Sequence, residues 1–89
     1  MRAVCTVLGK DKPGIIAAVS GALADRSVNI LDISQTIMQG FFTMITLVDL
    51  SEMSVSLDEL RRELDALGED ISVKIMLQHE DVYTAMNRL

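Results

Sequence analysis

Residues 30–50 read ILDISQTIMQGFFTMITLVDL, and the topology of the whole chain depends on this segment. Two runs rich in β-branched and apolar residues, 30–38 and 41–50, flank the dipeptide Gln39-Gly40. A glycine-containing dipeptide between two such runs predicts a β-hairpin. The second run is apolar at both of its alternating sets of positions. We therefore expect it to be a central strand that is covered on both faces.

The segment before this hairpin predicts a strand followed by a helix. Residues 2–8 are mostly β-branched or apolar and end at Gly9, whereas the apolar residues of 15–26 recur at helical spacing. The turn cluster KDKPG, residues 10–14, separates the two elements. Residues 27–29 then predict a tight reversal into the hairpin.

The segment after the hairpin predicts a second helix, a last strand and a terminal helix. Ser56 and Glu59 form a capping box at the start of the second helix, and Gly68 is expected to end it. Residues 71–79 alternate between apolar and polar side chains, which predicts the strand. The terminal helix is expected within residues 80–89, where three apolar residues recur at helical spacing: Val82, Met86 and Leu89.

The order β-α-β-β-α-β, with right-handed crossovers, predicts an α+β, ferredoxin-like sandwich: a four-stranded antiparallel sheet with two helices on one face, plus a short C-terminal helix. The chain of 89 residues makes one domain, 1–89, with about 80–89 as a helical extension. The second face of the sheet would carry apolar residues such as Val4, Leu8 and Phe41 or Phe42. A second subunit is its simplest cover, and the terminal helix, in cis or swapped between subunits, is an alternative.

Composition and charge exclude several classes of partner. The net charge is −5, and the 8 basic residues are scattered along the chain, so nucleic acid is not an expected partner. No apolar run approaches the ~20 residues that a membrane-spanning helix needs, and the first residues do not resemble a signal peptide. A single cysteine cannot form an internal disulfide. Cytoplasmic localisation is therefore expected, without a membrane partner.

Few residues offer catalytic or metal chemistry. Cys5 and His79 fall on strands expected to be neighbours, but nothing suggests an oxyanion hole, and a buried core thiol is the favoured interpretation of Cys5. Cys-x-x-Cys pairs are absent, and the adjacent residues 79–81, HED, rarely converge on one metal ion. We therefore expect no enzyme, no cofactor and no metal site.

The loop over residues 9–14 offers binding chemistry instead. A helix N-terminus attracts a carboxylate, and the nearby Asp11 suits an ammonium group, so the two together fit a zwitterionic amino acid. The alternative interpretation is that the cluster is only a turn.

The segment Gly9-Lys10-Asp11-Lys12-Pro13-Gly14-Ile15, followed by Val19, Leu23 and Val28-Asn29-Ile30, resembles the start of an ACT domain. Ile33-Ser34-Gln35-Thr36 and Phe42-Thr43-Met44 further resemble a subgroup of short, single-domain ACT proteins. That subgroup is often described as uncharacterised or as related to glycine-cleavage-system repressors.

The resemblance implies a regulatory protein without catalysis that forms a dimer or a higher homo-oligomer. ACT domains often pair side by side into one continuous sheet and bind small ligands, commonly amino acids, at the interface. Asp11 would then receive the ligand ammonium, the amides of Gly14 and Ile15 its carboxylate, and Asn29 either group. The full set of implied site residues comprises Gly9, Asp11, Gly14 and Ile15 from the loop, with Asn29 and Ile30 from the facing subunit.

Two functions remain open at this point. The first is an amino-acid sensor that changes its assembly, or its grip on a protein partner, when the ligand binds. The second is a ligand-free dimerisation or adaptor module that acts through a protein partner. Under the second function, Gly14 and Asn29 are simply residues that turns require.

Overall fold

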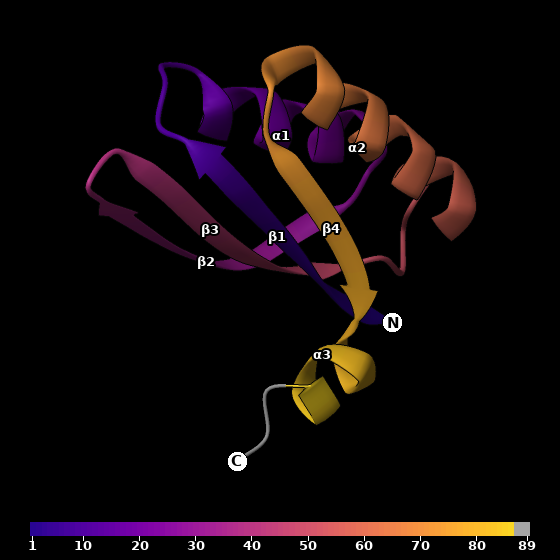
Figure 1. Ribbon diagram of the computed structural model, residues 1–89. Coiled ribbons are helices and arrows are strands. Elements are labelled where there is room, and N and C mark those ends of the chain that lie inside the picture. Colours follow the sequence, from indigo (N-terminus) through magenta and orange to yellow (C-terminus); the bar gives the residue numbers. More distant parts are fainter. Residues whose placement is uncertain (87–89) are drawn as a thin grey trace.

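The computed structural model describes residues 1–86 and confirms the predicted ferredoxin-like fold (Figure 1). The four strands form one sheet in the order β2-β3-β1-β4, and all neighbouring strands are antiparallel. The elements along the chain are β1 (Arg2–Lys10), α1 (Ile15–Asp25), β2 (Asn29–Met38), β3 (Phe41–Asp49), α2 (Leu57–Ile71), β4 (Lys74–His79) and α3 (Glu80–Met86).

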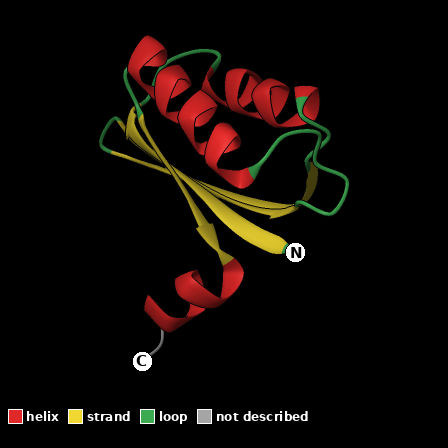
Figure 2. Cartoon of the chain, turned by 90° about the vertical axis from the view of Figure 1, so that its right-hand side faces the viewer, coloured by secondary structure: helices red, strands yellow, loops and turns green. Residues whose placement is uncertain are grey.

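The molecule has two main layers. Helices α1 and α2 cover one face of the sheet, and α3 lies on the opposite side, at one end of the sheet (Figures 1 and 2). The core lies between the sheet and the two covering helices, because aliphatic side chains from both layers are removed from water there. Its fully buried members include Val7, Val19, Leu23, Met44, Val48, Leu60 and Leu64.

The predicted hairpin connects β2 and β3. Gln39 and Gly40 have φ values of 50° and 83°. Two consecutive residues with positive φ match the twist of the strands that they join, which is the geometry favoured for a two-residue hairpin. Gly40 adopts this conformation without steric cost.

The end of the second helix differs from the prediction. Helix α2 continues through Gly68 to Ile71, and the left-handed residue at its C-terminus is Ser72, with φ 59°. Consequently Ile71 belongs to the helix, and the last strand begins only at Lys74. Gly68 is small for another reason: an added Cβ would lie 2.6 Å from the carbonyl oxygen of Val73.

Strand β3 is central, as predicted, but the described chain covers it fully on one face only. Phe42, on the side of α1 and α2, is 3% exposed, whereas Phe41, on the other side, is 61% exposed. Helix α3 contacts β1 and β4 but not β3. The predicted apolar stripe of the terminal helix includes Val82, which is 50% exposed, while Leu89 lies outside the described residues.

Candidate functional site

The N-terminus of α1 is open. Gly14 precedes the helix with φ 87°, and no side chain caps it. The first intrahelical hydrogen bond runs from the amide of Ala18 to the carbonyl of Gly14. The amides of Ile15, Ile16 and Ala17 therefore have no partner within the helix, and the helix dipole adds partial positive charge at the same place.

Two contacts fix the loop between β1 and α1. The amide of Asp11 donates to the carbonyl oxygen of Gly40 at 2.8 Å, which ties the loop to the β2–β3 turn. The Lys12 ammonium donates to the carbonyl oxygen of Ile71 at 2.7 Å, which ties it to the end of α2. The loop is thus held at both sides, while the Asp11 residue as a whole remains exposed.

A groove of about 460 Å³ lies beside this loop, between the start of α1 and the far end of β2. Most of the surface that lines the groove is apolar. Its two charged residues, Asp11 and Lys12, belong to the loop. We call it the α1–β2 groove. It is lined by Asp11, Lys12, Gly14, Ile15, Ile16, Ala17, Ser20, Gln35, Ile37 and Phe42.

The structure brings three of the predicted site residues to this groove. Asp11, Gly14 and Ile15 line it, and because the Ile15 residue is only 3% exposed, its side chain belongs to the core. Gly9 does not line it. It pairs with Phe42 inside β1, and an added Cβ would lie 2.8 Å from Cγ1 of Val73, so close packing explains this glycine.

The other two predicted residues lie at the opposite end of β2. Asn29 pairs with Asp49 at the start of β2, and Ile30 packs against the core. Ile37, which lines the groove, pairs with Phe42 near the other end of the strand. Within one chain, therefore, Asn29 and Ile30 are not brought together with the loop.

Sequence reasoning did not identify the β2 wall of the groove. Gln35 and Ile37 lie at alternate positions of β2, on the side of the sheet that α1 covers. The alternation of the strand was visible in the sequence, but only the sheet order shows that this strand lies at an edge beside α1.

A second groove, of about 570 Å³, lies where α2 ends and β4 begins. Its charged residues are Asp65, Glu69 and Lys74, and none of the predicted site residues lines it.

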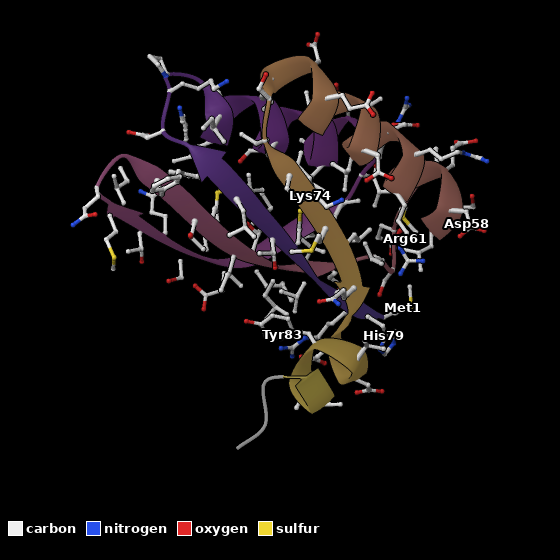
Figure 3. The ribbon with its side chains drawn as sticks, in the orientation of Figure 1. Met1, Asp58, Arg61, Lys74, His79 and Tyr83 are labelled. Carbon is white, nitrogen blue, oxygen red and sulfur yellow. The ribbon has the colours of Figure 1, made fainter. Side chains whose placement is uncertain are left out.

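Cys5 and His79 do not form a catalytic pair in this structure. Cys5 pairs with Leu77 and is fully buried, and burial raises the pKa of its thiol to about 11. The interpretation of Cys5 as a core thiol is confirmed. His79 lies at the junction of β4 and α3 (Figure 3), where its Nδ1 accepts a hydrogen bond of 3.1 Å from the amide of Asp81.

Over residues 1–86, no group of three or more histidine, cysteine, aspartate or glutamate side chains is placed to hold a metal ion. No helix in the same part of the chain has the length and apolar character needed to cross a membrane.

The comparisons with a family model, with related sequences and with solved structures agree on one family. Residues 2–78 match the model of the ACT domain family. A UPF0237 protein of Methanopyrus kandleri is 53% identical over 88 residues, which cover 99% of this chain and 98% of the relative. The solved structure of an ACT domain protein from Streptococcus pneumoniae is 43% identical, covers 93% of both chains and superposes with a TM-score of 0.81.

A putative glycine cleavage system transcriptional repressor has a similar fold. Its structure superposes with a TM-score of 0.73 at 24% identity, covering 86% of this chain and 44% of the repressor. At this identity the likeness concerns the fold alone. The resemblance to short ACT proteins noted in the sequence is thereby confirmed.

Proposed function

Because the chain belongs to the ACT domain family, whose domains are regulatory ligand-binding modules, we propose that it is a non-catalytic cytoplasmic sensor that binds an amino acid between two copies of itself. The bound ligand changes the assembly of the protein or its grip on a protein partner, through its different affinity for the two states.

The α1–β2 groove is the observation that carries this proposal. Free amides at the start of α1 suit the ligand carboxylate, and the exposed Asp11 suits its ammonium. The apolar walls behind them accept a side chain. The volume of about 460 Å³ falls in the usual range of small-molecule sites.

The edge of β2 is the surface that supports pairing of two copies. Strands β2 and β4 are the two edges of the sheet. At the β4 edge, Arg61 of α2 donates from Nε to the carbonyl oxygen of Leu77 at 3.2 Å, so the chain's own helix occupies part of that edge (Figure 3). Strand β2 is ten residues long, exposed along most of its length, and lacks the proline or lysine residues that commonly block edge pairing.

Antiparallel pairing of β2 with β2 of a second copy would complete the groove. A pair centred on Ser34, with the extra residue of the bulge between Ile30 and Asp32 left unpaired, sets residue 37 of one copy opposite residue 30 of the other. It brings Asn29 of the partner subunit beside Met38, at the end of the strand that borders the groove. The loop and the reversal, which lie apart within one chain, would then meet in the dimer.

One observation favours the alternative function, a ligand-free adaptor: the two glycines of the predicted site are explained by the structure of the chain alone. Gly9 is required by its contact with Val73, and Gly14 by its positive φ. Neither glycine needs a ligand to explain it. Asp11 has no such structural explanation, because its hydrogen bond to Gly40 uses the backbone amide rather than the carboxylate.

The test is a thermal-shift screen of the purified protein against the twenty amino acids, followed by calorimetric titration. A ligand at a hundred times its dissociation constant adds about 2.7 kcal/mol of stability, which is a shift of several degrees for a small domain. Asp11→Ala keeps the backbone hydrogen bond to Gly40, so we expect it to abolish binding without changing the fold or the assembly. Asn29→Ala should weaken binding as well.

Asp70→Ala, at an exposed position near the end of α2, is the matched control and should bind like the wild type. No shift with any amino acid, from a protein that still assembles, would favour the adaptor. Binding that survives Asp11→Ala would contradict the site assignment.

A further inference from the structure

The face of the sheet turned away from α1 and α2 carries an exposed apolar patch at one end. Phe41 pairs with Met38 of β2 and with Lys10 of β1, and Leu8 pairs with Lys74 of β4. Leu8, Met38 and Phe41 are 38%, 69% and 61% exposed. We call these five residues the distal patch. Contiguous apolar groups rimmed by polar residues mark interaction surfaces more often than single exposed side chains do.

The other end of the same face is occupied by the chain itself. Helix α3 contacts β1 and β4 there, on the side of the sheet opposite α1 and α2 (Figure 2). An ion pair of 2.8 Å between Arg2 and Glu80 joins the start of α3 to β1. Val4, which lies on this face because it pairs with Leu47 and Gln78, is only 5% exposed. The face is therefore half covered, and its apolar distal patch is the half left open.

Helix α3 has the complementary chemistry. It begins with two acidic residues, Glu80 and Asp81. The next residue, Val82, is 50% exposed. The distal patch carries two lysines, Lys10 and Lys74, beside its apolar side chains. Opposite charges at the rim and apolar groups between them are the features that fix the register of an interface and exclude other partners.

We propose that the distal patch binds α3 of a second copy of this chain. The patch and α3 lie at opposite ends of one sheet face. A two-fold axis between two facing sheets, perpendicular to their strands, therefore sets each α3 on the other copy's patch. Both contacts are identical, as an isologous interface requires. Val82 packs beside Leu8 and Phe41, and the acidic start of α3 lies toward Lys10 and Lys74.

This interface is separate from the β2 edge. The β2 edge joins sheets side by side, whereas the distal patch and α3 join them face to face. A protein that uses both surfaces forms a closed tetramer with two kinds of two-fold contact when the two axes intersect, and an open array when they do not. The inference does not depend on a ligand in the α1–β2 groove.

The test measures the mass of the assembly by native mass spectrometry and by light scattering after size exclusion. Leu8→Glu and Val82→Glu place a charge in the apolar contact, and Lys10→Glu reverses a charge at an exposed position where it cannot disturb the core. Each should weaken the assembly at least tenfold or halve its mass. Ala66→Glu, on the exposed side of α2, is the matched control and should change nothing.

A cross-linking experiment identifies the occupant. Leu8→Cys and Val82→Cys proteins, mixed and treated with a short bis-maleimide, should form a linked heterodimer, because the native Cys5 is buried and does not compete. If the thiol at position 8 stays fully reactive in the assembled protein, no second copy covers the distal patch. That result would overturn the inference. An assembly whose mass and stability stay at the wild-type values in all three charge variants would overturn it too, while leaving the β2-edge dimer and the ligand site standing.

Discussion

The Lys12 ammonium lies 2.7 Å from the carbonyl oxygen of Ile71, the last residue of α2, and donates a hydrogen bond to it. The two residues are 59 positions apart in the sequence. A positive charge at a helix C-terminus stabilises the carbonyl groups that have no partner within the helix. The same lysine lines the α1–β2 groove, so one side chain links the candidate binding loop to the end of α2.

We expect Lys12→Ala to lower the free energy of unfolding by about 0.5–1 kcal/mol, because an exposed charge-assisted contact is lost at the helix end. Urea denaturation measures the change. Lys12→Arg keeps a charged donor and should restore most of the stability. Equal stability of the alanine variant and the wild type would show that the contact contributes nothing in solution.

Gly68→Ala and Gly21→Ala form a matched pair with opposite expected signs. At Gly68 a Cβ would lie 2.6 Å from the carbonyl oxygen of Val73, a backbone atom that cannot move easily. At Gly21, in the middle of α1, an added Cβ meets no atom within 4 Å. Gly68→Ala should lose about 1–3 kcal/mol through strain, and Gly21→Ala should gain about 0.4–1 kcal/mol through helix propensity and reduced freedom of the unfolded chain. Chemical denaturation of both variants in one buffer measures the difference. Equal effects in the two would contradict the contact at Gly68.

Gly68 also shows where sequence reasoning succeeded and where it failed. The element order, the Gln39-Gly40 turn and the start of α2 at Ser56 were predicted correctly, because turn chemistry, periodicity and capping act within a few residues. In the sequence, a glycine that follows a stripe of leucines looks the same in two cases. It can end the helix, or it can lie inside the helix where another segment packs too closely for a side chain. The two are distinguished by the path of the chain just after the helix, where the amide of Val73 donates to the carbonyl oxygen of Gly68 at 2.9 Å and the carbonyl oxygen of Val73 lies where a Cβ would stand. The left-handed turn at Ser72 that sets this path was not identified in the sequence.

The candidate site divides in the same way. The loop residues Asp11 and Gly14 were predicted because they are close in sequence and lie at a helix start. The wall formed by Gln35 and Ile37 depends on which strand lies at the sheet edge beside α1, and no local pattern encodes that. The position of Asn29 relative to the groove depends in addition on a second copy of the chain.

Thr46→Val should stabilise the protein. The Thr46 residue is 1% exposed, pairs with Cys5 and Ile33 in the neighbouring strands, and its Oγ1 has no hydrogen-bond partner within the described residues. A buried polar group without a partner costs about 1–3 kcal/mol. Valine keeps the branched shape without the hydroxyl, so we expect a gain of about 1 kcal/mol or more in urea denaturation. Thr46→Ala, which also removes the hydroxyl but leaves a cavity, is the control and should not be stabilising. A loss of stability in the valine variant would mean that the hydroxyl is hydrogen-bonded in solution.

The thiol of Cys5 should make the folded protein less stable at alkaline pH. Burial raises the pKa of this thiol to about 11, because the thiolate is poorly solvated in the core. The unfolded chain therefore releases the proton at lower pH than the folded protein does. The stabilising contribution is fully present below about pH 9 and is lost as the pH rises toward 11.

Urea denaturation of the wild type and of Cys5→Ala across pH 7 to 11 isolates this effect, since every other titrating group is common to both proteins. Whatever advantage the wild type holds at pH 7 should shrink through this window, and Ellman's reagent should label Cys5 only after unfolding. A constant difference between the two proteins, or rapid labelling of the native protein, would show that the thiol is accessible to solvent.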